Sequence, residues 1–314
     1  MKTLISLILL LVVGSVQAAY TLRDGKLVDA KTVATLSAQD HYNAGVEAHQ
    51  GENWKEAARQ FRIVSDNFPV HELSSDAAFF LGVSEYKAGE LEFANEAFNQ
   101  YIKAKGNAKY FQEAIKYKLL IANDLAGGGK KRLFGTRQLP KWGSGKELAA
   151  KVYDEVIAAV PCHDYAAKAL YAKGHLKWDL GEYKSSIEAF QMVAKRFPKH
   201  ELAPEAYVAI SQVYVDESAD EFQNPDALAF AQINLRRFKQ DFPKEERLTL
   251  VEEDVLSIKE NYAKGLFNTG QFYEKTSRPQ AAVIYYQKAL SQFPETKTAE
   301  QCKNRLSVLD IKSQ

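Results

Sequence analysis

An internal repeat is the feature that most constrains the fold of this 314-residue chain. Four Phe-Pro pairs and a weaker Val-Pro copy recur at Phe68-Pro69, Val160-Pro161, Phe197-Pro198, Phe242-Pro243 and Phe293-Pro294. Twelve residues before the proline, most copies have an alanine: Ala57, Ala149, Ala231 and Ala282. Eight residues before it, most have an aromatic residue: Phe61, Tyr153, Phe190 and Tyr286. A sixth copy lacks the proline and keeps Ala94 and Phe98. The partner segments contain Gly45, Gly82, Gly174 and Gly270, where a second helix must pass closely.

This pattern resembles the tetratricopeptide repeat, which has two antiparallel helices per unit, small residues where they cross and proline at the exit. Proline suits the exit because it cannot continue a helix. We therefore expect an all-α fold, a tetratricopeptide-repeat solenoid of about six helix pairs with a C-terminal capping helix. The expected pairs are 39–50 with 53–67, 74–87 with 90–104, 108–125 with 145–159, 164–179 with 182–197, 203–218 with 225–241, and 248–275 with 278–292, followed by the cap near 296–311.

The N-terminal 18 residues have the pattern of a secretory signal peptide. Lys2 precedes an apolar run from Leu4 to Val13, which is too short to span a bilayer comfortably, and Val16-Gln17-Ala18 supplies the small-residue end. We expect cleavage after Ala18, or one residue later. Residues 19–38 are expected to form an N-terminal tether, with a small hairpin around Asp24-Gly25 as an equal alternative. The repeat array is expected over 39–311, with a loop insertion at 126–144.

Composition and motifs give no support for catalysis, cofactors, metal or nucleic acid. Apolar residues make up 46% of the chain and the net charge is only +1, so a globular fold without a strong global field is expected. The six histidines include no pair at zinc-helix spacing, and the chain has neither a Cys-x-x-Cys nor a Gly-x-Ser-x-Gly motif. Cys162 and Cys302 lie three repeats apart, so we expect two independent, mostly buried thiols instead of a disulfide.

The insertion is locally basic and aromatic. Its candidate docking residues are Lys130, Lys131, Arg132, Phe134, Arg137 and Trp142, accompanied by Lys141, Leu133 and Leu139. One interpretation is a docking loop for an acidic protein or a lipid head group. The other is a solvated loop whose apolar residues fold back onto the array. We favour solvation for the charges, whereas Phe134 and Trp142 need burial somewhere.

Three segments resemble the BamD family of outer-membrane β-barrel assembly proteins. Residues 52–69, from Glu52-Asn53-Trp54 to Phe68-Pro69, are similar to that family's first repeat. Leu133-Phe134-Gly135, followed by a charged loop and the returning segment 146–161, is similar to its interrupted third repeat. Residues 267–286, which include Phe272-Tyr273-Glu274-Lys275, are similar to its late helix pair.

The resemblance implies a scaffold in the periplasm, peripheral to the outer membrane. In that family the early repeats receive unfolded β-barrel precursors and the late repeats dock the central barrel subunit. This chain departs from the family in two respects: no cysteine precedes Cys162 for lipid attachment, and an extra repeat lies around 164–198. The alternative is another periplasmic repeat adaptor of the cell envelope, of the Tol-Pal coordinator type. Its usual N-terminal coiled coil would not fit into residues 20–38.

A peptide-binding groove is expected along the first helices of repeats one to three. The repeat register assigns to it Tyr42, Val46, His49, Phe79, Val83, Tyr86, Lys87 and Leu119. Several of these residues could equally be core residues between helices. We favour the groove for Tyr42, His49 and Tyr86, because their amphipathic side chains suit a half-wet surface.

Overall fold

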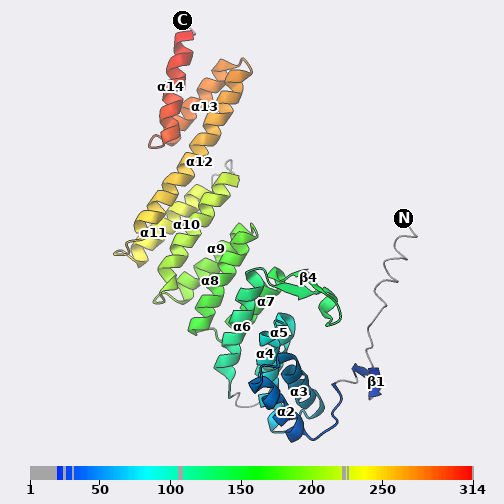
Figure 1. The fold of residues 1–314 in the computed structure, drawn as a ribbon. Helices are drawn as coiled ribbons and strands as arrows, with labels where there is room; N and C mark the ends of the chain where they lie inside the picture. The colour runs from blue at the N-terminus through cyan, green and yellow to red at the C-terminus, as the bar shows by residue number, and fades with distance from the viewer. Residues whose placement is uncertain are drawn as a thin grey trace, which may run out of the picture. The chain divides into compact units, whose positions relative to one another are not determined.

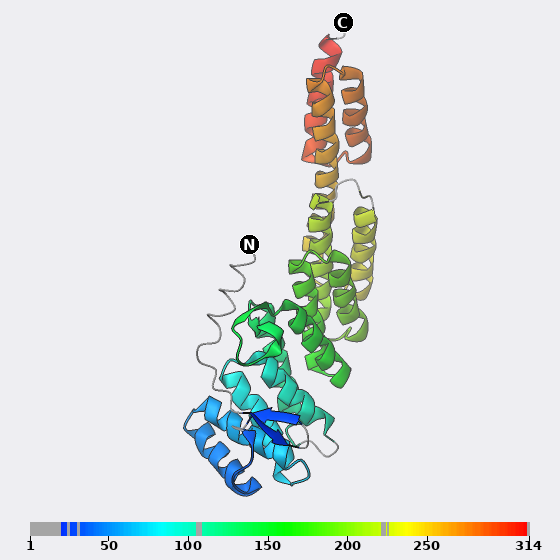
Figure 2. The ribbon, with the colours of Figure 1, turned by 90° about the vertical axis from the view of Figure 1, so that its right-hand side faces the viewer.

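The computed structural model describes the backbone of residues 20–23, 26–29, 32–104, 109–220, 224 and 226–312. It divides into two compact units, residues 1–161 and 162–314, which are described separately below (Figures 1 and 2). The predicted signal peptide and its cleavage site at Ala18 lie outside the described residues.

The described residues of unit 1 form three consecutive helix pairs and two short hairpins. Strands β1 (Tyr20–Arg23) and β2 (Lys26–Asp29) pair antiparallel, which agrees with the hairpin alternative. The helices are α2 (Ala38–Gln50), α3 (Trp54–Asn67), α4 (Leu73–Lys87), α5 (Leu91–Lys103), α6 (Phe111–Ala126) and α7 (Lys146–Ala159). Between α6 and α7 lie β3 (Lys130–Arg132), the 3-10 turn η2 (Leu133–Gly135) and β4 (Lys141–Ser144).

Unit 2 contains three more pairs and a final helix. They are α8 (Asp164–Asp179), α9 (Tyr183–Arg196), α10 (Leu202–Asp220), α11 (Asp226–Asp241), α12 (Leu248–Lys275), α13 (Pro279–Gln292) and α14 (Lys297–Lys312). The predicted all-α fold of consecutive helix pairs is confirmed, and the observed helix ends lie within about three residues of the expected ones.

A glycine packed against an aromatic ring holds four of the helix pairs together. A Cβ atom built on Gly45 would lie 2.8 Å from Cε1 of Phe61, and one on Gly82 would lie 2.7 Å from Cε1 of Phe98. The pairs Gly174 with Phe190 and Gly270 with Tyr286 repeat this contact at 2.6 and 2.5 Å. These two positions of the sequence repeat therefore form one contact, in which the ring of the second helix fills the space above the glycine of the first.

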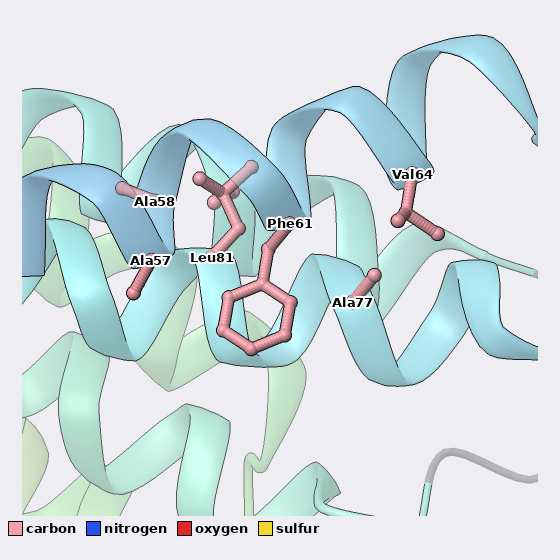
Figure 3. Packing of buried hydrophobic residues seen from close by; sticks show 7 residues of the cluster. Ala57, Ala58, Phe61, Val64, Ala77 and Leu81 are labelled. Atoms are coloured by element: carbon pink, nitrogen blue, oxygen red, sulfur yellow. The ribbon is translucent and has the colours of Figure 1, made fainter. Parts of the chain in front are cut away.

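The core of each pair is built from the repeated small and aromatic positions. Ala57, Ala94, Ala149, Ala231 and Ala282 are all fully buried. In the first repeat, Ala57, Phe61 and Val64 of α3 pack with Ala77 and Leu81 of α4 (Figure 3). Helix α3 therefore contributes to the core of its own repeat and of the next, which is the way a repeat array buries apolar surface.

Hydrogen bonds to His41 fix the segment that precedes the first repeat. The buried ring accepts bonds at Nε2 from the backbone N–H groups of Thr35 and Leu36, both at 3.1 Å. Its Nδ1 lies 2.6 Å from Oε1 of Gln60, so Nδ1 carries the proton and donates it. The side chain of Ser37 caps α2 by accepting from the backbone N–H of Asp40.

The last helix covers the final repeat. Cys302 of α14 is buried in a cluster with Ala282, Tyr286 and Ala289 of α13, and burial raises the pKa of its thiol to about 11. Cys162 is exposed in the connection between α7 and α8. The expectation of a mostly buried thiol is therefore wrong for Cys162, because the residue after Pro161 lies in a turn and not on a helix face.

Candidate functional site

The candidate binding residues of unit 1 lie on the first helices α2, α4 and α6. Tyr42 and His49 of α2 are half-buried, and His49 contacts the next repeat through a 3.3 Å hydrogen bond between Nδ1 and Oγ of Ser84. The His49 ring also meets the rings of Trp54 and Phe80 edge-on. Burial, followed by the nearby charge of Lys87, lowers the pKa of His49, which therefore favours the neutral ring at this surface.

Tyr86 links the second repeat to the third. Its hydroxyl donates to Oδ2 of Asp124 on α6 at 3.0 Å, and its ring lies 5.4 Å from that of Tyr117. Burial and the bond to Asp124 raise the pKa of Tyr86 to about 12, so the hydroxyl keeps its proton. The polar strip formed by His49, Tyr86, Lys87 and Asp124 therefore crosses three repeats.

Three of the predicted groove residues lie in the interior instead. Phe79, Val83 and Leu119 are 5%, 6% and 8% exposed. Phe79 stacks on Tyr110 at 4.4 Å and also contacts Phe98. These three side chains are therefore core residues between helices, which is the alternative that the sequence left open. They are buried because α4 packs against α3, α5 and α6 at once. Val46 is half-buried on the core of the first repeat, and Lys87 is exposed.

The sequence assignment missed the face that α6 exposes. The exposed Leu120 and Asp124 and the half-buried Tyr117 share that face, whereas Leu119 points inward. A shift of one residue rotates a side chain by about 100° around a helix. The spacing 117, 120, 124 was a signal for this face, since such positions lie on one side of a helix.

The insertion between α6 and α7 is a hairpin with a tightly packed base. The backbone N–H of Gly145 donates to the carbonyl of Gly129 at 3.0 Å, and a Cβ on Gly145 would lie 2.4 Å from that oxygen. Strands β3 and β4 pair antiparallel, with an irregularity between Lys131 and Arg132. The two ends of the hairpin are therefore hydrogen-bonded to each other where it joins α6 and α7. Figure 1 shows β4 beside these helices.

Ion pairs attach this hairpin to the second repeat. The Arg132 guanidinium donates to both carboxylate oxygens of Glu90 at 2.9 and 2.6 Å, and its backbone N–H donates to Glu92 at 2.7 Å. Lys141 donates to the carbonyl of Gly89 at 2.7 Å and lies 3.3 Å from Glu90. These bonds place the hairpin against the start of α5.

A buried carboxylate makes the second attachment. Glu85 of α4 has a 2% exposed side chain and accepts from both Arg62 and Arg137. Arg137 donates to its two oxygens at 3.1 and 2.7 Å, and its guanidinium lies 3.7 Å from the centre of the Phe93 ring. Such a buried, bidentate and stacked contact uses the geometry that is specific to arginine.

The aromatic residues of the insertion face solvent. Phe134 is 91% exposed and Trp142 is 74% exposed. The alternative in which the apolar residues fold back onto the array is therefore wrong for these two rings. The solvation expected for the charges is wrong for Arg132 and Arg137, whose side chains turn toward the second repeat. The reason is that Glu85, Glu90 and Glu92 offer partners to arginine and lysine on the surface that the hairpin covers. Lys130 is exposed, and Lys131 lies 3.6 Å from the exposed Glu147.

A buried lysine joins the second and third repeats. Lys118 is 1% exposed, and its ammonium donates to Asn95 at 2.6 Å, Asn99 at 2.5 Å and Glu155 at 2.6 Å. Burial disfavours ionisation of Glu155, but the bonds from Lys118 and the asparagines outweigh it and hold the pKa of this carboxyl below its usual value. Every proton of Lys118 has an acceptor, so the group is structural.

Comparison with known proteins agrees with this packing. Sequence models described as tetratricopeptide repeat match residues 42–117, and again 167–200 and 263–296. Each matched range contains at least one of the four glycine–aromatic crossings. The chain is a tetratricopeptide-repeat protein. Tetratricopeptide repeats form scaffolds for protein–protein interaction and are typically non-enzymatic.

Solved structures also resemble the array. The MamA protein is 16% identical with a TM-score of 0.37, over 67% of this chain and 92% of that one. A tetratricopeptide repeat protein from Parabacteroides merdae is 15% identical with a TM-score of 0.36, over 87% of this chain and 98% of that one. The apo form of RapI is 12% identical with a TM-score of 0.38, over 87% and 77% of the two chains. No curated protein matches the sequence.

Two further observations concern the described part of this tetratricopeptide-repeat chain. Its side chains include no group of three or more His, Cys, Asp or Glu residues that could hold a metal ion. Its helices include none that is both long enough and apolar enough to cross a membrane. The features that remain as a candidate site are the polar strip on α2, α4 and α6 and the anchored hairpin.

Proposed function

We propose that this chain is a periplasmic scaffold that binds proteins during outer-membrane β-barrel assembly. The tetratricopeptide array supports the protein-binding part of the proposal. The signal-peptide pattern ending at Ala18 supports export. The resemblance of residues 52–69, 133–161 and 267–286 to the BamD family supports the assembly role.

The insertion in the third repeat is the observation that carries the proposal. A generic helix pair needs only a short turn between its helices. Here residues 127–145 form a hairpin that Arg132 and Arg137 attach to the second repeat. It contains Leu133-Phe134-Gly135, which supplied the most specific part of the family resemblance. An anchored insertion at this place supports a dedicated scaffold over an unspecialised repeat array.

The polar strip on α2, α4 and α6 is the proposed place for an extended precursor segment. His49 and Tyr86 combine an aromatic body with a polar tip, and Lys87 adds an exposed charge. Such a surface can bind varied sequences through backbone contacts and stacking. The late repeats of unit 2 are the proposed docking region for the barrel subunit. The proposal assigns no catalytic residue and no cofactor.

Purification from crosslinked cell envelopes tests the assembly role. A tagged chain is expected to recover an outer-membrane barrel protein that carries periplasmic repeats, together with barrel precursors. Depletion of the chain is expected to lower the amount of folded barrel proteins. Recovery of the chain alone from the soluble periplasm, with unchanged barrel proteins after depletion, would show that it serves another envelope function.

Point variants test the binding surface separately. Tyr86→Ala removes the ring and the bond to Asp124, whereas Tyr86→Phe removes the bond alone. We expect Tyr86→Ala to weaken precursor binding and Tyr86→Phe to retain most of it, because stacking area dominates such contacts. Equal binding by the parent chain and Tyr86→Ala would refute this placement.

A further inference from the structure

The hairpin exposes two large aromatic rings on a rigid support. We call Phe134 and Trp142 the aromatic tip. Their exposed fractions are 91% and 74%, whereas the other aromatic residues of unit 1 whose burial is described are buried or half-buried. Both rings belong to one hairpin, Phe134 in η2 and Trp142 on β4, and large exposed apolar surface of this kind is a feature of interaction sites.

Phe134 has a left-handed backbone conformation, which is unfavourable for a phenylalanine. Residues 133–136 form a turn closed by a 3.3 Å bond from the N–H of Thr136 to the carbonyl of Leu133. Phe134 has φ 54° and ψ 19°, and Gly135 has φ 64°. Two left-handed residues in succession are favourable for Asn-Gly and unfavourable for a bulky side chain. The local conformation therefore does not explain why a phenylalanine is present, whereas a role for its ring does.

The exposure of the tip does not come from a loosely attached loop. Glu90 holds Arg132 and Lys141, and Glu85 holds Arg137. The base is closed at Gly129 and Gly145. Phe134 lies in the turn between the two strands and Trp142 lies on β4. The attachment fixes this hairpin, so the rings are held outward without having to be ordered at binding.

We propose that the aromatic tip inserts into the interfacial layer of a lipid bilayer. The inference rests on the proposed function only in that the exported chain would meet a membrane surface. Rings of Trp and Phe on a protruding element fit the head-group region, and a lysine nearby can extend its amine to the head groups. Lys130 is exposed and is paired in register with Ser144, and Ser144 and Trp142 are the exposed residues of β4.

The charges of the hairpin favour a lipid surface over an acidic protein. Arg132, Arg137 and Lys141 are engaged by Glu85 and Glu90 and are not free to attract an acidic partner. The two rings remain as the main contact. Burial of one such ring changes a partition coefficient by roughly one to two orders of magnitude, so the two rings give reversible attachment.

Vesicle binding tests the tip directly. The chain from Ala19 to Gln314 is used, because the apolar run before it would itself enter lipid. Cosedimentation with phosphatidylcholine vesicles is measured for the parent chain, Phe134→Asn, Trp142→Thr and the double variant. Phe134→Asn is the informative change, since asparagine suits the left-handed turn and only the ring is lost. Phe272→Gln removes an exposed ring of α12 in unit 2 and is the matched control.

The expected result is a loss of about tenfold for each tip variant and a larger loss for the double variant, with Phe272→Gln unchanged. Adding the anionic lipid phosphatidylglycerol is expected to strengthen vesicle binding, but by a smaller factor than the loss of the two rings weakens it. Binding that persists without both rings, or that disappears in high salt while the rings are present, would overturn the proposal.

Tryptophan fluorescence gives a second readout. Replacing Trp54 and Trp178 by Phe leaves Trp142 as the single tryptophan of this three-tryptophan chain. Its emission is expected to shift to the blue with vesicles and to be quenched by brominated lipid. An unchanged spectrum would overturn the proposal, as would protection of Trp142 by a purified envelope protein and not by lipid. Neither result changes the loss of folded barrel proteins that is expected when the chain is depleted. A failure of the lipid-insertion proposal can therefore be distinguished from a failure of the proposed assembly role.

Discussion

Replacing Gly82 by alanine should destabilise unit 1, although alanine is the better helix former. In an open helix the change would stabilise by about 1 kcal/mol. At Gly82 the added Cβ would lie 2.7, 2.8 and 2.8 Å from three ring carbons of Phe98. The ring is fully buried, so it cannot relieve the overlap by turning into solvent. Overpacking of this kind costs about 1–3 kcal/mol, and three simultaneous contacts favour the upper end, so the net loss is about 2 kcal/mol.

Thermal unfolding followed by circular dichroism measures this loss. For a unit of this size, about 2 kcal/mol corresponds to a decrease of roughly 4–8 °C in Tm. Gly51→Ala is the matched control, because its Cβ would lie at an ordinary 3.4 Å from the Glu47 carbonyl. A Gly82→Ala protein that melts at or above the parent temperature would refute the argument that these two positions form one contact.

A double-mutant cycle isolates the contact itself. Phe98→Leu removes ring volume and costs stability in the parent chain. In the Gly82→Ala background the smaller side chain also relieves the overlap, so the second substitution should cost about 1 kcal/mol less. Additive losses would show that alanine at position 82 acts on the helix and not on the ring.

Three further changes have defined outcomes. Lys118→Met should cost about 3 kcal/mol by leaving Glu155 without its cationic partner. Because the pKa of Glu155 is lowered in the fold, its ion pair stabilises above the ordinary carboxyl pKa and is lost as pH falls through the folded value, so acid destabilisation should be shallower in Lys118→Met. Glu90→Gln should raise hydrogen exchange of amides 130–144 at least about tenfold while exchange in α2 stays constant. His41→Ala leaves two backbone N–H groups without an acceptor and should cost about 2 kcal/mol in urea unfolding.

The fold was predictable because its determinants are local and repeated. The proline at each exit, the buried alanine and the aromatic residue recur at fixed offsets, so each copy supports the assignment of the others. Gly45, Gly82, Gly174 and Gly270 were recognised as crossing points, although sequence spacing alone did not say which ring each would meet. The structure pairs each of them with the aromatic residue eight positions before its repeat end.

The candidate site was less predictable because it depends on contacts between repeats. Phe79 and Leu119 satisfied the helical spacing of a groove but face the interior, since their helices pack on more than one side. The orientation of the insertion was opposite to expectation. Its arginines turn inward because Glu85 and Glu90, about fifty and forty residues earlier in the chain, accept hydrogen bonds from Arg137 and Arg132. Nothing in the local composition of residues 126–144 identifies those partners.

Site-specific photocrosslinking in cells tests the central claim most directly. A photoreactive residue at the exposed Lys87 reports on the polar strip, and one at the exposed Lys184 of α9 serves as the control position. The account predicts that Lys87 captures unfolded barrel precursors and Lys184 does not. Capture of no protein at Lys87, or the same products at both positions, would contradict the claim that this array is a scaffold for precursor proteins.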